Sequence, residues 1–186
     1  MNMVIKKNNQ QDGFFQNTPE FFKSFNGQLI SAKDIKATDF TALKVAIIGA
    51  NQQTVMHLET ITQQAKCVKV FQITPHFVLP HTEKGIHRLV SHPLIIKNRR
   101  LFNNRVKSLL AIRYLDSQIQ DQWLKRQLMP NSAAEHKVFF KSDRYYSTLQ
   151  RENCHLITWP IIKVTETSIQ TMEGIEHLVD IIITTY

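Results

Sequence analysis

Short apolar runs, separated by polar and turn-forming residues, recur along the chain. The run at 44–48 is rich in β-branched and small residues, as in a strand buried on both faces, and it stops at Gly49. Residues 51–64 then carry apolar side chains at every third or fourth position, which predicts a helix. A second run covers 67–71 and is closed by Thr74-Pro75. Together these segments predict a βαβ unit with parallel strands and a right-handed crossover.

Residues 94–130 have a different pattern. They are rich in Arg, Gln, Leu and Asn, contain no glycine and end at Pro130. Apolar residues at helical spacing predict one or two amphipathic helices, packed as an excursion from the sheet. These residues are Leu101, Val106, Leu109, Leu110 and Leu115.

Strand-like segments flank this excursion on both sides. An extended piece is expected near Leu29-Ile30, and a hairpin at 168–178 is expected to turn at Glu173-Gly174. Further strands are expected at 138–140, 155–157, 161–164 and 179–183. The pattern therefore predicts one α/β domain over 21–186, with a βαβ unit, a helical insertion and a β-hairpin. Residues 1–20, which are polar and rich in Asn, Gln and Lys, are expected to be a flexible tail.

Composition narrows the class of protein. Apolar runs stay far below the roughly 20 residues that cross a bilayer, and residues 1–11 lack a signal-like apolar stretch, so we expect a cytoplasmic protein without a membrane span. The net charge is +8. Basic residues gather at Lys97, Arg99, Arg100, Arg105, Lys107 and Arg113. This set is expected to form the solvated face of a helix, because neither interleaved aromatics nor a recognisable module indicates nucleic-acid binding.

Outside the first strand and helix, the histidines, cysteines and other reactive residues do not form the motif of a metal site or a catalytic site. His76, His81 and His87 lack the spacing of a metal site, and no metal ion is expected. The two cysteines, Cys67 and Cys154, fit buried thiols better than a disulfide framework. Tyr145-Tyr146 are expected to pack between the helical excursion and the sheet, and Ser142 and Asp143 have no triad partner, so no catalytic residue is assigned.

The turn after the first strand is the candidate phosphate loop. A dinucleotide loop uses glycines for the tight turn, for close approach of the pyrophosphate and for helix–strand packing. Here Gly49 and Ala50 are followed by Asn51 and Thr54 at the second and third glycine positions. Asn51 places a side chain where backbone should meet phosphate, although Asn tolerates a positive φ, and the helix start still favours an anion. Both an ordinary turn and a weak dinucleotide site remain open.

The segments around this loop resemble a known family. Residues 44–49, the following helix and 70–80 (Val-Phe-Gln-Ile-Thr-Pro-His-Phe-Val-Leu-Pro) are similar to the second Rossmann unit of flavin-containing and Baeyer–Villiger monooxygenases. Residues 136–146, 151–157 and 179–183 resemble later segments of that family in order and spacing. The resemblance covers about Phe25 to Tyr186 and implies a nicotinamide-binding domain of a class B flavin-dependent monooxygenase.

Departures from the family pattern concentrate at positions of chemistry. Ser31 and Ile35 stand where the family fingerprint has a histidine and an aromatic residue. Ile73 replaces an arginine that would pair with a 2′-phosphate, and Val138 replaces the arginine next to Lys137. The resemblance implies that Thr74 and Lys137 lie near the adenosine ribose or its phosphate.

We therefore expect weak binding of NADP or NAD, with little preference between them, through Gly49, Ala50, Asn51, Thr54, Thr74 and Lys137. No glycine-rich FAD loop precedes Gly49, so a truncated chain that is not catalytically competent by itself is expected, and FAD would come only with a missing domain or a partner chain. Two alternatives stay open. The chain could be one part of a split monooxygenase with an FAD-binding partner chain, or a non-enzymatic remnant that forms a homo-oligomer or another protein contact.

Overall fold

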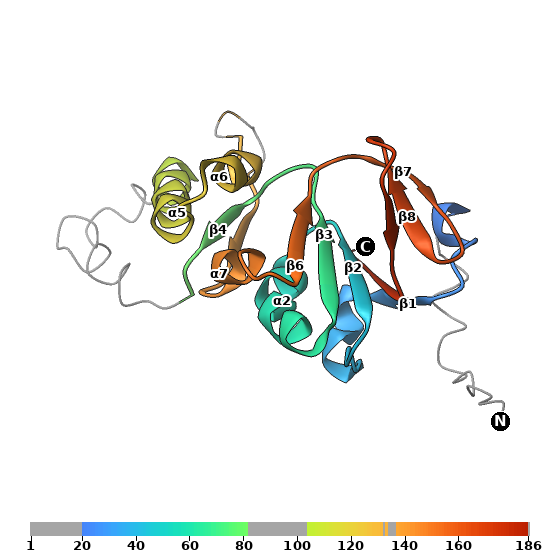
Figure 1. Ribbon diagram of the computed structural model, residues 1–186. Helices are drawn as coiled ribbons and strands as arrows, with labels where there is room; N and C mark the ends of the chain where they lie inside the picture. Colours follow the sequence, from blue (N-terminus) through green and yellow to red (C-terminus); the bar gives the residue numbers. More distant parts are fainter. Residues whose placement is uncertain (1–19, 82–103, 132, 134–136, 186) are drawn as a thin grey trace, which may run out of the picture.

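A five-stranded parallel sheet forms the centre of the protein (Figure 1). The computed structural model describes residues 20–81, 104–131, 133 and 137–185. The strand order is β1 (Gln28–Ser31), β10 (Ile181–Thr184), β2 (Lys44–Ile48), β3 (Cys67–Phe71) and β6 (Cys154–Ile157). The last strand in the sequence thus lies between the first two. Since all neighbours are parallel, all five carboxyl ends lie at one edge of the sheet.

The βαβ unit has the predicted elements. Strands β2 and β3 pair in parallel with Val45 opposite Val68, and helix α2 (Gln52–Gln64) connects them. The helix buries the positions that its apolar spacing indicates: Val55, Leu58 and Ile61 are each at most 2% exposed. The only shift is at its start, where Asn51 is the N-cap rather than the first helical residue.

The two faces of the sheet are covered by different structures. Val45 and Ile47 of β2 belong to the larger core cluster, beneath α2, α7 (Tyr145–Leu149) and the 3₁₀ helix η2 (Ala32–Ala37). Ala46, between them, faces a second cluster under the antiparallel sheet β7 (Ile161–Val164), β8 (Ser168–Thr171) and β9 (Glu176–Leu178), to which η1 (Glu20–Phe22) adds Phe22. This alternation follows the two-residue period of a strand.

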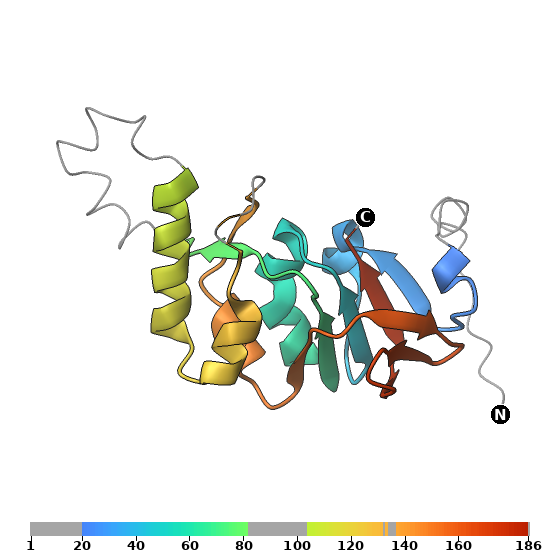
Figure 2. The same ribbon diagram turned by 90° about the horizontal axis from the view of Figure 1, so that it is seen from above.

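The predicted hairpin is the β8–β9 pair, and it turns at Gly174, whose φ is +82°. The helical excursion consists of α5 (Asn104–Gln118) and α6 (Gln122–Leu128), at the end of the molecule away from the antiparallel sheet (Figure 2). A small parallel pair, β4 (Phe77–Leu79) and β5 (Phe139–Lys141), joins this excursion to the main sheet. These elements confirm an α/β fold with a helical insertion and a hairpin.

Several local expectations were wrong. Leu109 is 62% exposed, and α5 buries the predicted Leu115 together with Ser108 and Ala111, which were not predicted. The final strand begins two residues later than expected, at Ile181, and the expected strand at 138–140 is shifted because Val138 lies outside β5 and is 47% exposed. Strand β4 and helix α7 had no counterpart in the predictions. Leu101 and the basic residues at 97, 99 and 100 lie outside the described residues, as does the predicted tail except Glu20.

Candidate functional site

A cavity of about 250 Å³ lies at the carboxyl ends of β2 and β3. This is where ligands bind in open parallel sheets. Its wall is formed by the ends of these two strands, by the loop after each of them, and by the segment that enters β7. The lining residues are Ile48, Gly49, Ala50, Phe71, Gln72, Ile73, Thr74, His76, Trp159 and Ile161.

Glycine is required at the turn that closes β2. Gly49 has a φ of +84°, and its N–H donates to the Phe71 carbonyl oxygen at 2.9 Å. A Cβ added at this position would lie 2.5 Å from Thr185 Oγ1, below any normal contact distance. Thr185 in turn donates its hydroxyl to the Ile48 carbonyl oxygen at 3.3 Å. The loop is therefore held between the end of β3 and the residue that follows β10.

Asn51 caps helix α2 and does not need a positive φ, because its φ is −139°. Its Oδ1 accepts from the Thr54 N–H at 3.0 Å, and its own N–H donates to Thr54 Oγ1 at 2.9 Å. The amide Nδ2 donates to the Thr185 carbonyl oxygen at 3.4 Å. The side chain is thus engaged by the helix start and by the segment after β10, instead of standing free where a phosphate would approach.

The capping box leaves part of the helix start available. The N–H groups of Asn51 and Thr54 are satisfied within the box. Within the described part of the chain, no acceptor meets the backbone N–H of Gln52 or Gln53. These two donors point along the helix axis toward its start, where the partial positive charge of the helix also favours an anion.

A hydrogen-bond chain fixes the loop after β3. Gln72 is 5% exposed; its Oε1 accepts from the Tyr145 hydroxyl at 2.7 Å, and its Nε2 donates to the Thr74 carbonyl oxygen at 3.3 Å. Burial raises the pKa of Tyr145, with the neighbouring Tyr146 and Cys154 as smaller contributions, so its hydroxyl stays protonated and donates. Helix α7 therefore orients one wall of the cavity.

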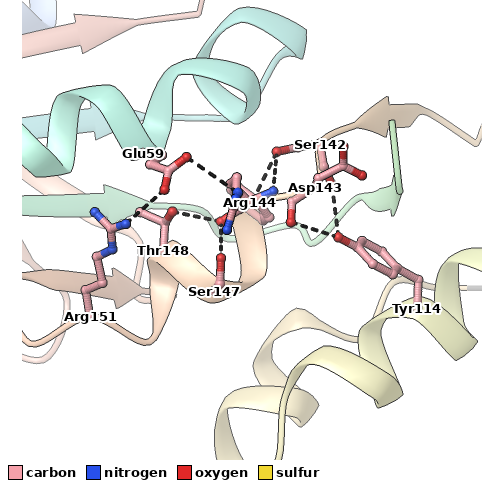
Figure 3. A network of polar contacts seen from close by, with 9 residues as sticks. Glu59, Tyr114, Ser142, Asp143, Arg144, Ser147, Thr148 and Arg151 are labelled. Atoms are coloured by element: carbon pink, nitrogen blue, oxygen red, sulfur yellow. Dashed lines mark hydrogen bonds and ion pairs between the residues drawn. The ribbon is translucent and has the colours of Figure 1, made fainter. Parts of the chain in front are cut away.

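Polar contacts in turn hold α7 against α2 (Figure 3). Glu59 of α2 accepts from Arg151 Nη2 at 2.9 Å and lies 3.9 Å from Arg144 Nε. Ser142 Oγ accepts from the backbone N–H of Tyr145 at 3.1 Å, and Asp143 Oδ1 accepts from the His81 N–H at 2.8 Å. Ser142 and Asp143 therefore have structural roles.

Three predicted site residues line the cavity, two belong to the adjacent helix start and one lies elsewhere. Gly49, Ala50 and the exposed Thr74 line it, while Asn51 and Thr54 form the helix start next to it. Lys137 is not among the lining residues; its Nζ lies 5.9 Å above the centre of the Phe77 ring. The aliphatic stem and charge of Lys137 are thus placed against β4.

Sequence reasoning missed the far wall of the cavity. Trp159, 50% exposed, and Ile161 follow β6 and enter β7. The rule that ligands gather at carboxyl ends of parallel strands could have drawn attention to the Trp159-Pro160 pair, but only with β6 assigned as a neighbour of β3. His76 completes the wall, and burial lowers the pKa of its imidazole, which favours the neutral form.

Other candidate groups do not assemble into a site. Within the described ranges, no group of three or more His, Cys, Asp or Glu side chains could hold a metal ion; His87 lies outside them. Cys154 is buried, which raises the pKa of its thiol to about 11, whereas Cys67 is only half-buried, contrary to expectation. No helix among the described residues is long and apolar enough to span a bilayer. Of the basic cluster, Arg105 and Arg113 are exposed.

Comparisons with known proteins point to one family. The chain is 29% identical to a Baeyer–Villiger monooxygenase of Pseudomonas aeruginosa and 27% identical to the FAD-binding monooxygenase ktnD of Aspergillus niger. These alignments cover 78% and 79% of this chain but 32% and 28% of the relatives. The fold is similar to that of an oxidised steroid monooxygenase bound to NADP, with a TM-score of 0.70, 20% identity and coverage of 91% of this chain and 44% of that one. No protein-family model matches the chain.

Proposed function

We propose that this chain, a relative of the class B flavin-dependent monooxygenases, corresponds to their nicotinamide-binding part. It would bind a nicotinamide nucleotide at the carboxyl ends of β2 and β3. The cavity beside the start of α2 is the observation that carries this proposal. The chain spans about a third of the length of its curated relatives. The oxygenation that their names describe is therefore a property of those longer proteins.

The described residues fit part of a nicotinamide dinucleotide. Gly49 and Ala50 would lie along the pyrophosphate, and the N–H groups of Gln52 and Gln53, at the helix start that follows Ala50, would donate to it. Thr74 would lie near the adenosine ribose. We propose weak affinity, with a dissociation constant on the order of 0.1 mM or above, because the capping box already uses two of the donors that would otherwise meet phosphate. When bound in its reduced form, the nicotinamide ring would supply a hydride for reduction of a flavin held by another domain or chain.

The described residues do not fit FAD. A flavin dinucleotide needs its own glycine turn after a parallel strand. Among the described glycines, Gly49 alone follows such a strand, because Gly27 precedes β1 and Gly174 lies in the β8–β9 turn. We infer that flavin chemistry requires an FAD-binding domain or chain in addition to these residues.

Calorimetry with NAD⁺ and NADP⁺ tests the nucleotide site. Ala50→Asp places a negative charge in the cavity wall beside the pyrophosphate, and we expect it to abolish binding. Leu109→Asp, at the exposed position on α5, adds the same charge away from the cavity and should leave affinity unchanged. Absence of binding by the folded wild-type chain, or equal binding by Ala50→Asp, would contradict the proposal.

A second candidate function is that of a protein-contact module. It is favoured by large apolar side chains that are half-exposed or more on the antiparallel sheet and near the cavity, namely Ile73, Trp159, Ile162, Met172 and Ile175. Exposed apolar groups of this kind mark contact surfaces. Co-expression with an FAD-binding monooxygenase segment, followed by size-exclusion chromatography with flavin absorbance, distinguishes the cases. A yellow complex would indicate the split enzyme, and a colourless dimer of this chain would indicate the module.

A further inference from the structure

The cavity at the ends of β2 and β3 has a wall without formal charge. Of the described residues that line it, none is Lys, Arg, Asp or Glu. Its ionisable member is His76, which burial keeps in the neutral form near pH 7. A nucleotide part bound here would therefore meet apolar surface and a few dipoles rather than cations.

Two polar groups in this wall, the Gln72 amide and the Gly49 N–H, are already engaged. The amide of Gln72 is satisfied at both ends, by the Tyr145 hydroxyl and by the Thr74 carbonyl oxygen. The turn N–H of Gly49 is taken by Phe71. A 2′-phosphate placed against the Ile73 side of this wall would lose water without gaining a charged partner, which is unfavourable.

Apolar side chains define the mouth of the cavity. Ile73 is 60% exposed and Trp159 is 50% exposed, and both line it. Trp159 offers a π-face of the kind on which nucleobases stack. The volume of about 250 Å³ is below that of pockets that enclose whole drug-sized ligands, so the cavity accommodates one end of a dinucleotide.

Lys137, the lysine that was predicted to lie near a 2′-phosphate, does not line the cavity. Lys137 lies over the Phe77 ring, and the nearby Lys107 lies over the stacked Phe139 ring, each with Nζ 5.9 Å from the ring centre. Both cations are thus held on the β4–β5 pair. Neither lines the cavity.

We propose that this cavity takes the adenosine end of an unphosphorylated dinucleotide, NAD(H), and discriminates against a 2′-phosphate, with Ile73 setting this preference and Trp159 stacking on the base. The proposal rests on the nucleotide-binding function above and names its ligand class. It replaces the expectation of little preference, because the described cavity wall offers a 2′-phosphate no Lys or Arg and an exposed, apolar Ile73.

Calorimetry at low salt tests this proposal with five probes, namely NAD⁺, NADP⁺, adenosine 5′-monophosphate, adenosine 2′,5′-bisphosphate and nicotinamide mononucleotide. NAD⁺ should bind at least about tenfold more tightly than NADP⁺, and adenosine 5′-monophosphate more tightly than adenosine 2′,5′-bisphosphate. Ile73→Arg should reverse or abolish both preferences, whereas Leu109→Arg, the same change on the exposed face of α5, should leave them intact. Trp159→Ala should weaken all probes by about fivefold or more, and Trp159→Phe should retain most of the affinity.

Three outcomes would overturn the proposal. Equal or tighter binding of NADP⁺ by the wild type would remove the selectivity while leaving nucleotide binding in place. Binding of nicotinamide mononucleotide but not of adenosine 5′-monophosphate would show that the cavity takes the nicotinamide half of the ligand and not the adenosine half. Absence of binding by every probe, with native circular dichroism, would remove the proposed function as well.

Discussion

The two edges of the central sheet differ in how they use polar groups. At the amino edge, an open cavity of about 310 Å³ is lined by Lys44, Glu166 and Asp180, so it is rich in charge. At the carboxyl edge, none of the described lining residues is Lys, Arg, Asp or Glu, and the cavity lies next to helix N–H groups without a described acceptor.

At the amino edge, charged side chains form hydrogen bonds between segments that are distant in the sequence. Asp180 accepts from the Lys44 backbone N–H at 2.7 Å, and Glu166 accepts from Asn26 Nδ2 at 3.3 Å. A cluster of charged side chains is therefore a poor guide to a ligand site in this fold. The carboxyl edge, with fewer charges among its described residues, keeps the groups that a nucleotide would use, and substitutions at the two edges should therefore have different effects on binding.

The largest effect is expected at Gly49. Gly49→Ala puts a Cβ against Thr185 Oγ1 at a positive φ, so we expect the free energy of unfolding to fall by about 3 kcal/mol in a urea titration. Gly174→Ala is the matched control, since its φ is +82° but its Cβ would meet nothing within 4 Å, and it should cost about 1 kcal/mol. Equal losses would show that the Thr185 contact has no energetic role. Thr185→Ala in the Gly49→Ala background should recover part of the loss.

The second-largest effect is expected from the hydrogen bond that connects α7 to the cavity wall, between Tyr145 and Gln72. Tyr145→Phe leaves the buried Gln72 Oε1 without its donor, and we expect a loss of about 1–2 kcal/mol together with weaker NAD⁺ binding. Tyr114→Phe removes a half-buried hydroxyl that contacts the Ser142 and Asp143 carbonyl oxygens, and should leave nucleotide affinity unchanged. Unaltered affinity in Tyr145→Phe would exclude a positioning role for this hydroxyl.

A smaller effect is expected at the amino edge. Asp180→Ala removes a hydrogen bond between an exposed carboxylate and the Lys44 N–H, which should lower the free energy of unfolding by about 1 kcal/mol. Its backbone N–H still donates to the Lys44 carbonyl oxygen, so the register of β10 and β2 should persist. Calorimetry should give wild-type affinity for NAD⁺. A binding defect would place a ligand at the wrong edge.

The smallest effect is a dependence of stability on pH. Burial lowers the pKa of His177, with Lys69 adding to the shift, and its Nε2 has no partner in the described structure. The unfolded state, with a pKa near 6.5, binds the proton more readily, so stability is full above about pH 6.5 and falls as pH drops toward the lower folded pKa. Urea titrations between pH 7.5 and 5.0 should show a shallower decline in His177→Leu. An identical decline would assign the acid sensitivity to other groups, such as His57 or His76, whose pKa values burial also lowers.

Elements with a clear local pattern could be predicted from the sequence. The β2–α2–β3 unit has a run of β-branched residues, a glycine and a helical apolar period in immediate succession, and the hairpin has Gly174 at its turn. Helix α7 spans only Tyr145–Leu149, too short to show a period, and β4 is a three-residue strand whose partner β5 lies beyond the whole helical excursion. Their formation depends on contacts between distant segments, which local patterns do not contain.

The candidate site shows the same division. The positions of Gly49 and Ala50 could be predicted from the strand pattern at 44–48 and the turn that ends it. The capping pair Asn51 and Thr54 has a recognisable three-residue spacing. The opposite wall could not be predicted, since Trp159 reaches the cavity only because β6 lies beside β3. Lys137 was expected near a phosphate from resemblance alone, and its position over a ring depends on the unpredicted β4.

The central position of β10 has a consequence for synthesis of the protein on the ribosome. Strand β1 is made early but, within the described sheet, pairs with β10 alone, and β10 also separates it from β2. Strand β1 must therefore wait for β10 to emerge before it gains its partner in this sheet, which raises contact order and slows folding. Ribosome-bound nascent chains that stop short of residue 181 should keep β1 accessible to proteases and chaperones, whereas β2 and β3 can already pair.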